Sequence, residues 1–482
     1  MMNKEKTIGW NFDNSYSNLP KSFIYEISPV PVKRPELVIF NHDLADQMGL
    51  NFSSVDNEQL AKMFSGNLLP KGSKSLAQAY AGHQFGHFTM LGDGRAVLLG
   101  EHISKSNQRL DIQFKGSGQT PFSRNGDGRA ALGPMLREYL ISEAMYSLNI
   151  PTTRSLAVVK TGENVIREKP LQGAILTRVA SSHIRVGTFQ FIRTRENLDE
   201  LNTLVNYTIK RHYPEIAKSK NNAYDLLSKL IDKQIELVVN WMRVGFIHGV
   251  MNTDNMAISG ETIDYGPCAF MNSYNLGTCF SSIDHMGRYA YGNQPAITKW
   301  NLARFAECLL TLINPNKDDA LKMATELIDK FDKIYEEKWF NMMKSKLGLI
   351  GDDKEDNLII FELLEIMKKQ ELDYTNTFLF LMDHEIDDKK SYQNEEFDNW
   401  KMKWQKRLTK DSKNLMELNN PVIIPRNHNV ENVLKSAENN DLTPFNDLLQ
   451  ALKNPYTNQK VLNKYQSPPP KSDEKYQTFC GT

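Results

Sequence analysis

A strict alternation of apolar and polar side chains runs through residues 109–115, RLDIQFK. This period of two is typical of a β-strand, because successive side chains of an extended chain point to opposite faces. One face would carry Leu110, Ile112 and Phe114, and the other Asp111, Gln113 and Lys115. The pattern therefore predicts a strand with an apolar face and a polar face that ends at a lysine.

Further strands and a helix are predicted around this one. Residues 87–90 and 95–103 are separated by LGDG, a good signal for a tight turn between two strands. Residues 174–180 predict another strand. Residues 132–150 predict a helix, with a proline near the first turn and another just past the end.

Beyond about residue 190 the pattern becomes mostly helical. Residues 223–246 are apolar on more than one side, which indicates a buried helix, and they run directly into residues 248–255, HGVMNTDN. Residues 256–266 are interpreted as two short strands. Residues 298–415 predict several amphipathic helices rich in Lys and Glu.

This order of elements predicts an α+β protein with a two-lobe, protein-kinase-like fold. Residues 1–180 would hold an N-terminal extension and a β-rich nucleotide-binding lobe. Residues 181–465 would form a mostly helical lobe with the catalytic loop and a metal site. Residues 466–482 contain a proline run and little apolar content, so we expect a mobile C-terminal tail.

Composition narrows the function classes. The chain has 482 residues, with 58 Lys plus Arg and 58 Asp plus Glu, so a nucleic-acid partner is not expected. No apolar run approaches the roughly 20 residues that span a bilayer, and the first residues lack a signal core, so we expect a cytoplasmic protein with no membrane partner. The four cysteines are too sparse for a disulfide scaffold and show no metal-binding spacing.

The segment 248–255 is similar to the catalytic loop of a protein kinase, but with a change. Kinases place an Asp two residues after the His, as the base that accepts the proton of the substrate hydroxyl. Here that place is Val250, and Asp254 appears later, beside Asn255. Asp264, in DYGP, resembles the metal-binding Asp of the kinase Asp-Phe-Gly motif. Because Mg²⁺ prefers oxygen ligands, Asn255 and Asp264 predict a metal site completed by ATP phosphates.

Basic side chains could hold those phosphates. Kinases use a strand Lys that is held by a Glu of the following helix, and Lys115 is the candidate here. Glu138 is the better partner, with Glu143 as the alternative on the same helix; a solvated Lys and Glu would also fit the pair alone. Arg178 and Arg185 offer forked donors suited to phosphate oxygens, although two surface arginines would look the same.

Two glycine turns could also approach phosphates through their backbone N–H groups. The first turn holds Gly92 and Gly94 before Arg95. The second holds Asp127 and Gly128 just before a predicted helix N-terminus, a place that favours anions. Each turn alone also fits a plain hairpin, so the two turns together with Lys115 carry more weight than either.

Four longer motifs carry a resemblance to a known family. YAGHQFGHFTMLGDGRA, DIQFKGSGQTPFSRNGDGRA, HGVMNTDNM and DYGPCAF resemble the selenoprotein O family of kinase-like protein adenylyltransferases, over nearly the whole chain. The resemblance implies transfer of AMP from ATP to Ser, Thr or Tyr hydroxyls of proteins, redox proteins among the possible targets, with Mg²⁺ or Mn²⁺. It also implies a flipped ATP, whose α-phosphate meets the nucleophile, so that no base would be needed at Val250.

The resemblance assigns roles to the residues above. Asp254 would be the base, Asn255 and Asp264 would bind the metal, and Glu138 would hold Lys115. Contacts to the nucleotide would come from Gly92, Gly94, Arg95, Lys115, Asp127, Gly128, Arg178, Arg185 and Asp264, with the two arginines at the terminal phosphate.

Cys480 stands where many animal members carry selenocysteine, so selenium dependence is not expected. We expect a reversible disulfide between Cys480 and Cys268 that links activity to redox state, with Cys279 as the rival partner and a free tail thiol as the alternative. Mass mapping of the oxidised protein that found only free thiols would contradict the disulfide.

Two other functions remain open from sequence. A phosphotransferase acting on a protein or small molecule would use the same Lys, Glu, Asn and Asp, but it usually needs the Asp that Val250 replaces. If the protein were a non-catalytic pseudokinase scaffold, the metal pair and the arginines would be remnants without a catalytic role.

Overall fold

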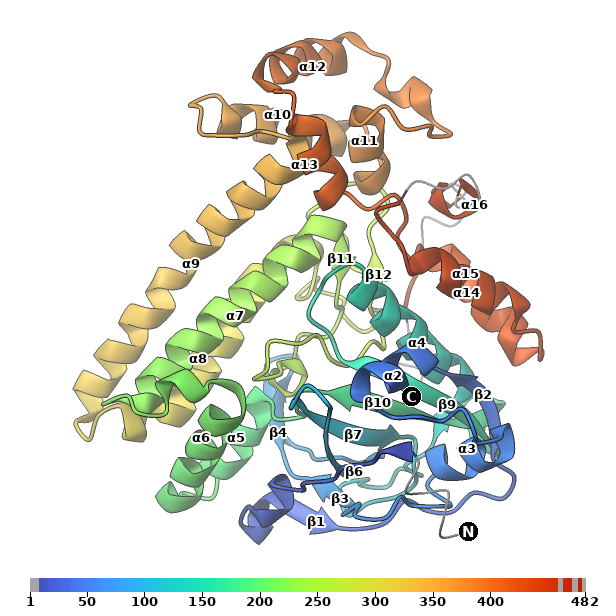
Figure 1. The fold of residues 1–482 in the computed structure, drawn as a ribbon. Helices are drawn as coiled ribbons and strands as arrows, with labels where there is room; N and C mark the ends of the chain where they lie inside the picture. The colour runs from blue at the N-terminus through green and yellow to red at the C-terminus, as the bar shows by residue number, and fades with distance from the viewer. Residues whose placement is uncertain (1–7, 458–462, 470–475, 479–482) are drawn as a thin grey trace.

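The structure, a computed structural model, describes residues 8–457, 463–469 and 476–478. Strands dominate the first part of the chain and helices the rest, so the predicted α+β class is confirmed (Figure 1). The last strand of the main sheet ends at Ala180. The division into three domains stays a prediction.

Within the described residues, eight strands form one antiparallel sheet. Their order is β1 (Ile24–Glu26), β3 (Leu76–Gln78), β6 (Ala96–Ile103), β7 (Arg109–Lys115), β10 (Pro170–Ala180), β9 (Arg154–Ile166) and β2 (Glu36–Phe40), with β8 (Ala130–Ala131) paired to β10. A separate hairpin is formed by β4 (Ala81–Gln84) and β5 (His87–Met90).

Helices cover both faces of the sheet. Val158 of β9 and Leu176 of β10 join the core that contains α4 (Leu132–Ser147). Their neighbours Val159 and Ile175 join a second core with α2 (His42–Met48) and α3 (Asn57–Phe64). Because the side chains in both cores are buried, these central strands have no solvent-facing side.

Strand β7 shows what this burial does to a polar face. Its alternation is as predicted, and Ile112 and Phe114 lie in the α2–α3 core. The polar face is buried as well, so each of its side chains needs a partner. Asp111 accepts hydrogen bonds from His183 Nδ1 (3.0 Å) and Arg211 Nη2 (2.6 Å).

The remaining part of the chain is helical. It contains α5 (Val186–Arg193), α6 (Leu198–His212), α7 (Asn222–Val244), α8 (Gln294–Ile313), α9 (Lys317–Leu347), α10 (Asp356–Lys369), α11 (Tyr374–Leu381), α12 (Glu395–Arg407), α13 (Ser412–Asn419), α14 (Asn427–Glu438), α15 (Thr443–Leu452) and α16 (Asn463–Gln466). Helix α7 is the predicted buried helix; Asn221 caps its first turn and Gly245, at φ 72°, ends it.

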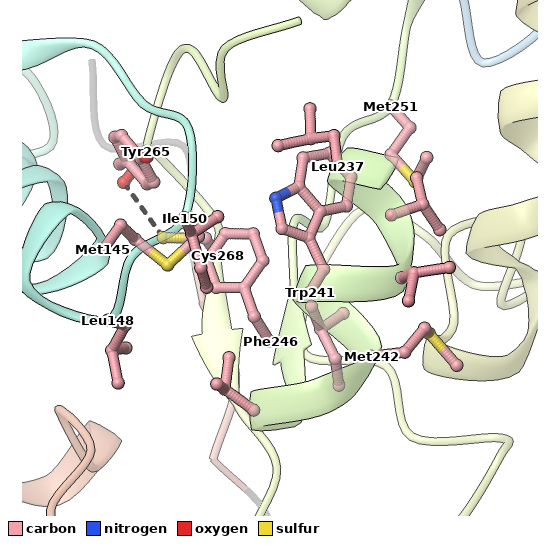
Figure 2. Close-up of a cluster of buried hydrophobic side chains, with 14 of the residues drawn as sticks. Met145, Leu148, Ile150, Leu237, Trp241, Met242, Phe246, Met251, Tyr265 and Cys268 are labelled. Carbon is pink, nitrogen blue, oxygen red and sulfur yellow. Dashed lines mark hydrogen bonds between the residues drawn. The ribbon is translucent and has the colours of Figure 1, made fainter. Parts of the chain in front are cut away.

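A shared core joins the two parts of the chain. Figure 2 shows Met145 and Leu148 at the end of α4 beside Phe246, with Trp241 on α7. Phe246 belongs to β11 (Phe246–Ile247), which pairs with β12 (Ala269–Phe270). This packing fixes the start of the 248–255 segment relative to the sheet, because a close-packed core has low compressibility and leaves little room for relative movement.

The strand pair predicted within residues 256–266 is not formed. Instead, Ala257 bridges to Arg185 and Thr262 bridges to Thr152. Apart from the turn bond from Gly260 N–H to the Ala257 carbonyl, the backbone of this segment bonds to neighbouring segments, as Ile258 does to Ile184 and Thr262 to Pro151. The segment is thereby fastened to the end of the sheet on one side and to the start of α5 on the other.

The C-terminal tail is described only in part. Thr478 forms a parallel bridge with Ser281, and its Oγ1 donates to the carbonyl of Pro267 (2.7 Å). Tail mobility stays a prediction. No helix within the described ranges is long and apolar enough to cross a membrane.

Acid should destabilise the fold partly through His183. Burial lowers the pKa of this imidazole from 6.5 to about 4. Between these values the unfolded chain binds a proton that the folded chain excludes, so this stabilisation is complete above pH 6.5 and is lost as the pH falls toward 4. We expect the free energy of unfolding to fall between pH 7 and pH 5 by on the order of 2 kcal/mol from this group. Urea unfolding at both pH values measures the fall.

The matched variants are His183→Gln and His87→Gln, since His87 is exposed on the hairpin. We expect the fall to shrink only in the first variant. An unchanged pH dependence in His183→Gln would contradict the assignment.

Candidate active site

The predicted site residues meet in one cleft of about 730 Å³ between the sheet and the 248–255 loop. The cleft is lined by Gly92, Gly94, Arg95, Lys115, Asp127, Gly128, Arg178, Arg185, Asp254, Asn255 and Asp264. Glu138 lies behind Lys115, on α4, rather than on the cleft surface. The volume of the cleft is typical of a small-molecule site.

A buried charge cluster lies at the back of this cleft. Lys115 Nζ contacts Glu138 Oε2 at 2.6 Å and Asp264 Oδ1 at 2.5 Å. Arg178 donates to Glu138 Oε1 through Nε at 2.7 Å and also through Nη2. Two cations therefore face two carboxylates, so each buried charge has a partner of opposite sign.

The cluster keeps both carboxylates ionised. Burial opposes ionisation, but Arg178 and Lys115 outweigh it and lower the pKa of Glu138. Burial is likewise outweighed at Asp264, where Lys115 and Arg178 hold the pKa well below its usual range. Glu143, the alternative partner for Lys115, is instead paired with Arg154, its Oε2 lying 2.6 Å from Nη2.

Asp264 is held by its backbone as well. Its φ of 69° lies in the left-handed region, which few residues other than Gly, Asn and Asp adopt. The ring of His248 contacts the carbonyl of the preceding residue, Ile263, at 3.0 Å through Nε2. The loop and the Asp264 segment are thus tied together next to the charge cluster.

The two arginines predicted as a pair have different surroundings. Arg178 is engaged by Glu138, and its Nη1 lies 3.4 Å from Gln113 Oε1. Arg185 lies over the ring of Tyr80 at 4.3 Å, and its Nη1 donates to the Asp254 carbonyl at 3.1 Å. Arg178 therefore belongs to the charge cluster, while Arg185 braces the loop.

The second glycine turn is closely packed. Gly128 has φ 64°, and a Cβ there would lie 2.2 Å from the Gly118 carbonyl, so glycine is required. Asp127 accepts a hydrogen bond from Arg167 (2.9 Å), which lowers its pKa. This carboxylate therefore organises the turn and its arginine.

Asp254 and Asn255 lie in a short 3-10 turn, Thr253–Asn255. Asn255 Nδ2 donates to the Val250 carbonyl (3.0 Å), so its amide oxygen is the end left to accept or coordinate. Asp254 is 7% exposed, and its Oδ1 has no hydrogen-bond partner among the described residues. Burial raises the pKa of Asp254 to about 6, against the lowering effect of Arg185.

The hairpin β4–β5 holds this loop, a role that the sequence did not reveal. The backbone N–H of His83 donates to Thr253 Oγ1 (2.7 Å), and that of Phe85 donates to Asn252 Oδ1 (3.0 Å). A Cβ on Gly82 would lie 2.2 Å from Asp254 Oδ1. Gly82, in the stretch YAGHQFGH of the first quoted motif, was the signal that the sequence offered for this contact.

Sequence reasoning also missed charges on the cleft wall. Arg124, Arg129 and Arg167 line it, as does buried Asp93, whose pKa is raised by burial to about 6. Counting only described residues, the wall carries seven basic side chains and four aspartates. Arg124 and Arg129 lie in the motif DIQFKGSGQTPFSRNGDGRA, which also contains Gly128. The excess of positive charge favours an anionic ligand.

A protein-only metal site is not formed here. Across the described ranges, no group of three or more His, Cys, Asp or Glu side chains could hold an ion. Asn255 and Asp264 therefore offer at most a partial oxygen site in the cleft.

The predicted disulfide is not tested, because Cys480 lies outside the described residues. Cys268 is buried, its thiol lies 3.5 Å from the Tyr265 carbonyl (Figure 2), and burial raises its pKa to about 12. Thr478 contacts Pro267, beside Cys268, and Phe280, beside Cys279, so both candidate partners lie near the docked tail.

Comparison with known proteins bears on this site. A family model described as protein adenylyltransferase SelO matches residues 6–453. The protein nucleotidyltransferase YdiU of Pelagibacter ubique (strain HTCC1062) is 64% identical over 482 residues, covering 99% of this chain and 100% of that protein. Proteins of the same name from Nitrosococcus oceani and Clostridium perfringens are each 55% identical over at least 99% of both chains. These matches confirm the resemblance drawn from the motifs. The chain belongs to the protein adenylyltransferase SelO family and is a protein nucleotidyltransferase.

Proposed function

We propose that this cleft transfers AMP from ATP to a serine, threonine or tyrosine hydroxyl of a protein target. The observation that carries the proposal is the meeting, in one cleft, of the buried Lys115 cluster with Asp254 and Asn255, while Val250 replaces the kinase base. The strand-rich and helical parts would be the two lobes of a protein-kinase-like fold, acting in the cytoplasm.

Positive charge supports binding of the ATP phosphates. Lys115 reaches the cleft although it is tied to Glu138, as a phosphate-gripping lysine is in kinases. Arg185 and Arg95 line the same wall. Arg178 would act mainly by holding Glu138, since its donors already have protein partners.

Asn255 and Asp264 suit Mg²⁺ or Mn²⁺ bound together with ATP. Asn255 has its oxygen free of the Val250 contact, and Asp264 is held ionised by Lys115 and Arg178. Two protein oxygens plus phosphates and water match the way Mg²⁺ binds in nucleotide sites. The ion would supply neutralisation of phosphate charge as pyrophosphate leaves.

Asp254 would take the proton of the target hydroxyl. The hydroxyl oxygen bonds to the α-phosphorus, the bond from that phosphorus to the bridging oxygen breaks, and pyrophosphate leaves. Asp254 lines the cleft, and its buried Oδ1 has no hydrogen-bond partner in the described part of the chain, which favours its acceptance of a proton. Gly82 leaves room for this oxygen, and Arg185 fixes the loop through its backbone.

Labelled ATP tests the reaction. With Mg²⁺ and a generic protein acceptor, we expect label from the α-phosphate to become covalently attached, and none from the γ-phosphate. γ-Label alone would restore a phosphotransferase. Neither label, together with no ATP binding, would favour a non-catalytic scaffold.

Loss of one ligand of the metal pair should be detectable as weaker metal binding, in a measurement that needs no catalysis. We expect Asn255→Leu to weaken ATP-dependent Mn²⁺ binding by roughly tenfold or more, since one of two protein oxygens is lost. Electron paramagnetic resonance of free Mn²⁺ measures this. Asn240→Leu, on the surface-facing side of α7, is the control. Equal Mn²⁺ binding in both variants would contradict the ligand role.

Removal of the base should reduce turnover and spare binding. We expect Asp254→Asn to lower the rate of AMP transfer by about 10²- to 10⁴-fold, the usual contribution of a general base. Fluorescent ATP binding and the thermal midpoint should stay near those of the parent chain, because the amide keeps the shape of the side chain. Transfer at the parent rate would show that another group accepts the proton.

A further inference from the structure

A second cavity lies in the helical part, well defined by aromatic rings. It has a volume of about 340 Å³ and shares no lining residue with the cleft. Its walls come from α8, α9, α10 and α11, from the end of α7, and from the segments that hold Tyr274, Leu276, Tyr291 and Gly292. Figure 1 shows α9 running alongside α7 and α8.

Aromatic side chains make up much of this wall. They are Tyr274, Tyr291, Phe331, Tyr335, Trp339 and Tyr374. The rings of Tyr274 and Tyr374 are stacked, with centroids 5.8 Å apart, and both Tyr291 and Tyr374 donate to the Met242 carbonyl, at 2.7 and 3.0 Å. These contacts fix the rings before any ligand arrives, which lowers the entropy lost on binding.

The charge of the wall has one sign. Asp332 and Glu336 are the charged lining residues, both on exposed positions of α9. Asp332 is paired with Lys299 at 2.6 Å, whereas Glu336 has no ion-pair partner in the part of the chain that the structure describes. Burial raises the pKa of Tyr274 to about 12, and the nearby Glu365 adds to this rise through its negative charge.

We propose that this pocket binds a basic side chain, an arginine or a lysine, of a protein target. Aromatic faces attract cations, and adjacent carboxylates add charge complementarity that an apolar occupant would not use. About 340 Å³ accommodates such a side chain with its neighbouring backbone. The exposed Leu276, 48% accessible, offers apolar contact for the methylene stem.

A buried lysine nearby shows why the carboxylates matter. Lys346 lies over the ring of Phe378 at 3.9 Å and over Tyr374 at 5.1 Å, and donates to the Arg243 carbonyl. It has no carboxylate partner among the described residues, and burial lowers its pKa well below the usual value. Lys346 is thus surrounded by rings and a carbonyl but, within the described ranges, no carboxylate, whereas the open pocket adds the exposed Glu336, which is the residue that the proposal requires.

The inference rests on the proposed function only in that the bound protein would be an AMP acceptor. Binding to the pocket is measured without ATP, so its failure is distinguishable from failure of AMP transfer. Labelling with 5-fluorotryptophan gives a ¹⁹F signal for each of the six tryptophans, and Trp339→Phe identifies the signal from the pocket.

The probe is the capped pentapeptide Ac-Gly-Ala-Arg-Ala-Gly-NH₂, and the comparison peptide has norleucine in place of arginine. We expect the arginine peptide to shift the Trp339 signal, and half-saturation by the norleucine peptide to need a roughly tenfold higher concentration. We expect the affinity of a lysine peptide to lie between those of the other two peptides or to equal that of the arginine peptide.

Glu336→Lys and Glu337→Lys form the matched pair, because both positions are exposed neighbours on α9 and only Glu336 lines the pocket. We expect the first variant to weaken binding of the arginine peptide by roughly tenfold, and the second by less than about twofold. Equal shifts by the arginine and norleucine peptides would overturn the proposal in favour of an apolar occupant. No shift of the Trp339 signal by any peptide, or equal loss in both variants, would overturn it as well.

Discussion

The site depends on the buried ion cluster that Lys115, Glu138, Arg178 and Asp264 form. Each member comes from a different part of the chain: two neighbouring strands, helix α4 and the segment after the loop. Lys115, Glu138 and Arg178 are buried, while Asp264 is partly exposed to the cleft, so removal of any buried member leaves an uncompensated charge. Breaking such a pair costs about 3–5 kcal/mol, several times the worth of a surface ion pair. The cluster therefore locks the sheet, the helix and Asp264 into one geometry.

The loop needs a second set of constraints because the cluster does not reach it. Its start is fixed by the apolar core around Phe246, and its end by hydrogen bonds from the β4–β5 hairpin and from Arg185. The hydrogen bonds are short and directional, and each joins a backbone group on one segment to a side chain on the other. Asp254 can then be buried without a close cation on its carboxylate, since the loop is held by other groups. Packing of the loop elsewhere offsets the cost of burying this carboxylate.

Local pattern predicted much of the fold, and contact over long sequence distances explains the remainder. The strand 109–115 and the long helix before the loop were evident from periodicity, because each carries its own signal. The preference for Glu138 over Glu143 followed from the kinase analogy, yet only the packing of α4 shows that Arg154 takes Glu143. The hairpin around His83 lies about 170 positions from the loop that it holds, and no local pattern reports such a contact.

Two sequence interpretations were limited for the same reason. Arg178 and Arg185 looked like an equivalent pair, but one sits on a central strand facing Glu138 and the other begins α5 beside the loop. Residues 256–266 have the composition of a hairpin, but their backbone groups find partners on other segments. In both cases the side chain or backbone group makes a predictable type of contact. Which partner it meets is decided by the topology.

Charge distribution connects the cleft with the aromatic pocket. The whole chain is neutral, with 58 basic and 58 acidic residues. That balance conceals a cleft wall with more basic than acidic side chains and a second pocket whose charged lining is acidic. A polyanion such as ATP is attracted to the first and repelled by the second, and a basic protein segment shows the opposite preference. Separate surfaces of opposite sign would thus let one neutral protein bind ATP and the proposed basic segment without competition between them.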